Sequence, residues 1–314
     1  MRRQLLFLLL LNAIALQISA QETVPAKKNK FKCPKIDHPW SPKNWIPRTQ
    51  LRQSFQGKLE KDEAAFFNIV NPHQKPSSYN LSVALGYNVF CDAKLSTLRP
   101  FIEWQKNTVA DKPQNVFLTG LDYQLQFWDP TVQGHERKWT PFLLVKGNYK
   151  NDIIKKVEGA QASLLFFPAW NSKNDKFYPL PDAVTSGTVL EFFYNTYIGI
   201  EYENRGRSVT VGAEGTAVRA YGRITGTFNP FPKLLDKRLE FIPDFTYRQA
   251  MSNNSALEKD KNSIWKWSAN LVLLSKEKSG IADFKFGVDY VNGVDPTKGF
   301  DKQRVITYSF KIKI

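Results

Sequence analysis

The sequence predicts an all-β fold: a transmembrane antiparallel up-and-down β-barrel of about twelve strands behind an irregular basic N-terminal leader. From about residue 60 onward, apolar and polar residues alternate with period two, which is typical of β-strands. The alternating runs cover about 10–15 residues, longer than the roughly 5–6 of globular strands and long enough to cross a bilayer at a tilt. No apolar run after residue 20 reaches the length of a membrane-spanning helix.

The first twenty residues predict a secretory signal peptide that is cleaved after Ala20. Arg2 and Arg3 precede an apolar run from Leu5 to Leu16, and the small-residue site Ile18-Ser19-Ala20 follows. An uncleaved membrane helix is the alternative, but the apolar run is too short for it. We therefore expect an exported chain.

Residues 21–57 predict a periplasmic leader rich in proline and lysine, which leaves residues 58–314 for the barrel. Its lysines carry much of the formal net charge of +15, and they are Lys27, Lys28, Lys30, Lys32 and Lys35. Such a run favours an anionic surface such as lipid headgroups or cell-wall polymer, although a solvated leader explains it equally well. A nucleic-acid partner is not expected for an exported chain.

The alternation of apolar and polar residues along the chain defines the expected strands. The clear ones lie at 79–91, 117–127, 190–202, 239–248, 265–273, 284–290 and 303–314, and weaker ones at about 97–107, 138–150, 157–168 and 208–228. Bacterial single-chain barrels have an even number of strands, so these eleven require a twelfth, for which residues 61–71 are the best candidate. Strand 79–91 then runs inward, and both its following turn and the long connection 170–187 lie on the periplasmic side.

Aromatic residues gather near the strand ends, as in the aromatic girdles of membrane barrels. They include Tyr79, Phe127, Trp128, Trp139, Tyr202, Trp265 and Tyr290. An exported soluble β-sandwich or a lipocalin-like barrel would also alternate. It would not need apolar and aromatic residues on one parity of almost every long strand.

The stretch "FKFGVDYVNGVDPTKGFDKQRVITYSFKIKI" resembles the closing hairpin of bacterial outer-membrane β-barrel proteins of the Bacteroidota type, with a terminal Ile where many members have Phe or Tyr. The resemblance implies that the last strand closes the barrel against the first and is read by the barrel assembly machinery. It places Tyr308, Phe310, Ile312 and Ile314 outward, against outer-membrane lipid. Other envelope proteins are further candidate partners.

No catalytic, cofactor or metal site is expected. The three histidines, His38, His73 and His135, lie in the leader or in loops, and none shares a strand face with a serine and an acid. Zinc-binding spacings, a P-loop and a dinucleotide fingerprint are absent from the sequence. An enzyme is therefore disfavoured, although a site built only from carboxylates stays open.

The inward parity carries charges of both signs. These are Arg99, Glu103, Asp122, Lys146, Glu191, Glu201, Arg219, Arg223, Glu240, Asp244, Arg248, Lys266, Asp283, Lys285 and Asp289. Arg219 and Arg223 are expected to face Glu240 and Asp244, with Lys266 next across. Two hypotheses follow: a passive or selective channel for small polar solutes, or a non-conducting barrel that serves as anchor or subunit of an envelope assembly.

The mature chain holds two cysteines, Cys33 and Cys91. An even count in an oxidising compartment predicts a disulfide between the leader and the base of the barrel. The alternative is two unrelated thiols.

Overall fold

The computed structural model describes residues 48–55, 65–70, 78–92, 96–108, 113–127, 139–170, 184–207, 214–254, 261–275, 283–295 and 302–313. All of them belong to one compact unit that spans Cys33–Ile314. The predicted signal peptide, Cys33 and the three histidines lie outside the described residues.

The described residues are almost entirely β-strands, and the turns between β7 and β8 and between β11 and β12 are described in full. The bounds of the strands are β1 Thr49–Arg52, β2 Ala65–Val70, β3 Ser78–Tyr87, β4 Phe90–Asp92, β5 Ser96–Asn107, β6 Gln114–Gln126, β7 Trp139–Asp152, β8 Val157–Trp170, β9 Thr185–Ser186, β10 Leu190–Arg207, β11 Gly215–Pro230, β12 Leu239–Asn253, β13 Lys261–Leu274, β14 Asp283–Gly293 and β15 Gln303–Lys313. Within the described part of the chain, no helix is long and apolar enough to cross a membrane.

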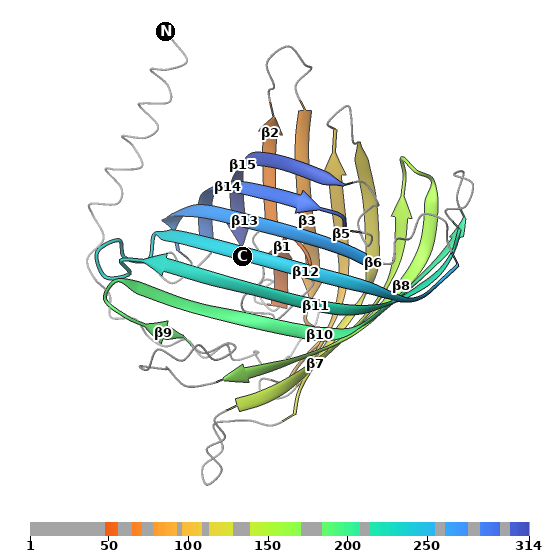
Figure 1. Cartoon of the computed structure of the whole chain (residues 1–314), viewed down its shortest axis with the longest axis horizontal. Helices are drawn as coiled ribbons and strands as arrows, with labels where there is room; N and C mark the ends of the chain where they lie inside the picture. Colours follow the sequence, from red (N-terminus) through yellow and green to blue (C-terminus); the bar gives the residue numbers. More distant parts are fainter. Residues whose placement is uncertain are drawn as a thin grey trace, which may run out of the picture. The chain divides into compact units, whose positions relative to one another are not determined.

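Twelve of these strands form an antiparallel up-and-down barrel, as the sequence predicts. Each long strand pairs with the next along the chain, and β15 pairs with β2 to close the circuit. In Figure 1, strands β10 to β15 run across strands β2, β3, β5 and β6, as the two walls of a tilted barrel do. Among the described residues, the closing seam consists of Phe310, Lys311 and Ile312 of β15, which have ladder partners in β2.

The first strand position of the barrel is shared by two separate segments. β2 pairs with β3 from Ser78 to Ser82, and β1 pairs in the same direction with β3 from Ala84 to Tyr87. The segment assigned to the leader up to residue 57 therefore contributes a strand to the wall. The prolines that precede it hide the strand in the sequence.

The strands place polar side chains inside and apolar side chains outside. On β10, Ile198 and Ile200 of the outward parity are 62% and 47% exposed, whereas Glu201 of the inward parity is buried. The same inversion holds on β13, where Leu271 is exposed and Asn270 is buried. A soluble protein would bury these apolar side chains, so the outer surface is built for an apolar surrounding.

We call the end of the barrel at which β15 finishes the base, and the opposite end the mouth. The backbone N–H of Asn88 donates to the carbonyl of Arg48 over 3.0 Å, so the chain joins the barrel at the base, beside the end of β3. β4, which contains Cys91, pairs with the start of β5 at this same end. The end of β8 and the start of β10 also lie at the base, as the twelve-strand count requires.

A charge on the outer surface should destabilise the barrel far more than the same charge in a turn. Ile198 lies mid-strand on β10, so Ile198→Arg should lower the free energy of unfolding in lipid vesicles by about 2–4 kcal/mol. Leu234→Arg is the matched control, because Leu234 is 81% exposed in the turn between β11 and β12. Equally small losses for both variants, measured by denaturant titration, would mean that the outer surface faces water.

Candidate functional site

The candidate site is the charged inner face of the barrel. All fifteen charged residues predicted from parity lie on the inward side of their strands. Arg99, Arg219 and Arg248 are at most 2% exposed, although arginine is among the residues most rarely buried. Buried charges of this kind need partners of opposite charge, and the ion pairs below supply them.

Near the base, Arg99 of β5 forms an ion pair with Asp122 of the adjacent strand β6. Its second terminal nitrogen, Nη1, donates to Oε1 of Gln50 in β1 over 2.7 Å. This arginine therefore joins the N-terminal segment to the barrel wall.

Glu103 is the neighbouring acid on β5. Its Oε2 accepts a hydrogen bond of 3.1 Å from the hydroxyl of Ser54 and lies 3.8 Å from Nζ of Lys146 on β7. The Lys146 ammonium also lies 4.6 Å from the ring centroid of Phe101, an attractive cation–π geometry.

Towards the mouth, Glu203 of β10 is the centre of a cationic cluster. Its carboxylate contacts Arg219 at 2.6 Å, Arg205 at 2.9 Å and Lys150 at 3.2 Å, and it accepts from Gln161 over 3.1 Å. Of these residues, only Arg219 is among those predicted from the sequence. Parity could have identified the others, since Lys150 shares the inward side with Lys146, and Glu203 and Arg205 share it with Glu201.

Two further ion pairs are bidentate. One joins β11 to β12, and the other joins β10 to β12. Arg223 donates to both carboxylate oxygens of Asp244, over 3.0 and 2.7 Å. Arg248 donates to both oxygens of Glu201 over 2.6 and 3.2 Å, and it also lies 3.5 Å from Asp295. Bidentate pairing fixes the guanidinium plane as well as its position.

The expected pairing of four residues on β11 and β12 is therefore half correct. Arg223 does face Asp244, but Arg219 pairs with Glu203, and Glu240 pairs with Lys285 of β14 at 2.7 Å. The ladder explains this difference, because Arg219 lies opposite Ala250, at the other end of β12 from Glu240.

The remaining predicted charges occupy the β13–β15 wall and the base. Asp289 contacts Nζ of Lys311 at 2.5 Å and accepts from the hydroxyls of Ser268 and Ser309. Lys266 lies directly opposite Asp244 in the ladder, and Asp283 opposite Lys313. Glu191 pairs with Lys237 of the β11–β12 turn at 2.7 Å.

These ion pairs share one geometric property. Those that join two strands connect neighbouring or next-nearest strands of the wall, for example β5 with β6, β10 with β12, or β12 with β14. Arg205 and Glu203 share β10, and Lys237 lies in the β11–β12 turn. None of them crosses the lumen from wall to wall. The charges therefore form a lining that follows the circumference of the barrel.

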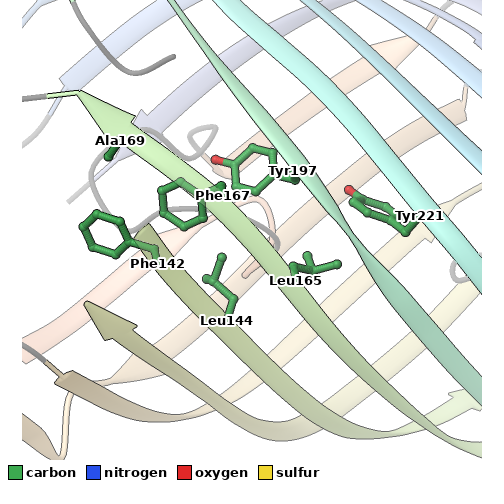
Figure 2. Close-up of a cluster of buried hydrophobic side chains, with 7 residues drawn as sticks. All are labelled: Phe142, Leu144, Leu165, Phe167, Ala169, Tyr197 and Tyr221. Atoms are coloured by element: carbon green, nitrogen blue, oxygen red, sulfur yellow. The ribbon is translucent and has the colours of Figure 1, made fainter. Parts of the chain in front are cut away.

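An apolar patch interrupts this lining at the base of one wall. Figure 2 shows it on β7, β8, β10 and β11, where Phe142, Leu144, Leu165, Phe167, Ala169, Tyr197 and Tyr221 form a buried cluster. The rings of Phe142 and Phe167 stack with centroids 4.8 Å apart. The sequence places only Lys146 of β7 on the inward parity and assigns no inward residue on β8, so this patch is not predicted from it.

The described residues contain no group of three or more His, Cys, Asp or Glu side chains that could hold a metal ion. The buried acids described above face arginine or lysine partners. The arrangement can attract, orient or exclude charged and polar solutes.

A double-mutant cycle tests the corrected pairing. Glu240→Gln and Lys285→Gln should show a coupling energy of about 1–3 kcal/mol in the free energy of unfolding, since each single change strands the other charge. Glu240→Gln with Arg219→Gln is the control. These residues lie roughly 30 Å apart along the strands, and their effects should add within about 0.5 kcal/mol. Coupling to Arg219 instead would contradict the register.

Comparison of the chain with protein-family models, with curated proteins and with solved structures finds no match. The site is therefore defined by the residues and contacts of this chain alone.

Proposed function

We propose that the protein is an outer-membrane β-barrel that acts as a passive or selective channel for small polar solutes. The observation that carries the proposal is the location of the ion pairs relative to the wall and the lumen. The ion pairs named above, among the described residues, run along the wall and do not bridge the lumen. A polar, charge-lined interior inside an apolar exterior suits the passage of hydrated solutes through a membrane.

The proposed orientation places the base in the periplasm. The chain joins the barrel at the base, and β15 also finishes there, which agrees with a leader on the periplasmic side. The last strand would then be available to the barrel assembly machinery. No catalytic step, metal or cofactor is part of the proposal.

A non-conducting barrel, acting as anchor or subunit of an envelope assembly, is the second candidate. The near-complete burial of Arg99, Arg219 and Arg248 favours it, because side chains that face a wide water channel would be more exposed. The two candidates differ in one measurable property, the conductance of the purified protein.

Conductance in a planar bilayer tests the channel. The protein should give discrete single-channel currents. The side chains of Glu240 and Lys285 are mostly buried but each keeps 16% exposure, so neutralising either should change the ion selectivity. Glu240→Gln should shift the reversal potential towards anion selectivity, and Lys285→Gln should shift it in the opposite direction. A folded protein without conductance would support the second candidate instead.

We also propose the disulfide between Cys33 and Cys91. Its support is the even cysteine count and the place of β4, which carries Cys91 at the end of the barrel where the N-terminal segment joins it. Intact-mass spectrometry after alkylation without a reductant should find both cysteines unlabelled, and labelling should appear after reduction. Two free thiols in the unreduced protein would remove this proposal.

A further inference from the structure

The N-terminal segment Arg48–Phe55 does more than complete the wall. Gln50 and Arg52 of β1 lie opposite Gly86 and Ala84, on the inward parity of β3, and all four are buried. After Arg52 the chain leaves the ladder. The carbonyl of Gln53 accepts from Ser82 over 3.3 Å, and Ser54 donates to the inward carboxylate of Glu103. Ser54 therefore lies on the lumenal side of the wall.

Phe55 follows Ser54, and its side chain is enclosed by side chains of the barrel wall. Its side chain is 1% exposed and lies in a buried cluster with Ala84, Phe101, Val116 and Leu118. The Phe101 ring centroid is 5.5 Å away, and the guanidinium carbon of Arg99 lies 4.2 Å from the centroid of the Phe55 ring. Glycine is required below it, because a Cβ at Gly86 would lie 2.5 Å from the ring and 2.8 Å from Cδ of Arg99.

We propose that Ser54 and Phe55, at the end of the segment Arg48–Phe55, form a lumenal plug that covers the inner face of β3, β5 and β6 and narrows the proposed channel. The inference rests on the proposed function for its effect on conductance. The covering of the wall stands on the contacts of Phe55 alone. The same segment holds Arg99 and Glu103 through Gln50 and Ser54, so it orients two charges of the lining as well.

Two variants unseat the plug by different routes. Phe55→Ala removes the ring, and Gly86→Ala pushes the ring out from below without changing the segment. Gly222→Ala is the matched control, because nothing lies within 4 Å of a Cβ at that strand position. Folding of every variant is checked by the mobility of unheated samples in SDS gels.

The first readout needs no conductance. A single cysteine at Ala84, which is fully buried beside Phe55, is introduced together with Cys33→Ser and Cys91→Ser. We expect a water-soluble maleimide to label it slowly in this background and in the Gly222→Ala protein. Labelling should be roughly tenfold faster with Phe55→Ala or Gly86→Ala, since burial controls thiol access. Equal rates in all four folded proteins would overturn the plug.

The second readout is single-channel conductance. Side chains set the bore of a small barrel, so both unseating variants should raise the unitary conductance roughly twofold and the control should not. Faster labelling together with an unchanged conductance would overturn the narrowing of the channel. Absence of conductance in every protein would overturn the proposed function, and the labelling rates would still decide whether the segment covers the wall.

Discussion

Closure of the sheet on itself is the constraint on which the rest of the structure depends. A backbone in an apolar surrounding must satisfy its N–H and C=O groups internally, and a barrel does so only if its last strand meets its first. Among the described residues, this meeting consists of three residues of β15 with ladder partners in β2. β1 extends the same edge of β3 beyond β2, so the N-terminal segment supplies ladder positions that β2 leaves unfilled.

Closure also decides where charge can reside. The outer parity faces the apolar surrounding, so the charged side chains of the strands turn inward, where each needs a partner. The partners lie one or two strands away, because the long side chains of arginine and lysine extend along the wall over the intervening strand. Lys150 reaches Glu203 across β8 in this way, and Lys285 reaches Glu240 across β13. The lining is thus a consequence of the strand order.

The fold was predictable because a regular alternation of apolar and polar residues shows which side of a strand faces inward. Such alternation is regular on β6, β10 and β12–β15. The stretches "PFLLV" of β7 and "SLLFFPAW" of β8 are apolar on both parities, so the inward Phe142 and Phe167 gave no signal. The sequence also does not show which charges pair, because pairing depends on the register between strands. Glu240 lies opposite Asn270, and Asn270 lies opposite Gly287, so Lys285, two residues before Gly287, lies near Glu240. β1 was missed because four residues among prolines are too few to show a period.

The composite first strand limits how the plug can move. Withdrawal of the whole segment would leave the edge of β3 from Ala84 to Tyr87 without its ladder partners. Each unsatisfied backbone group costs several kcal/mol in an apolar surrounding, so β1 should stay in the wall. Movement of Ser54 and Phe55 breaks side-chain contacts, such as those with Glu103, Arg99 and Phe101, but no ladder pair of β1 with β3. The chain therefore separates two roles at Arg52: Thr49–Arg52 closes the wall, and Ser54 and Phe55 extend into the lumen.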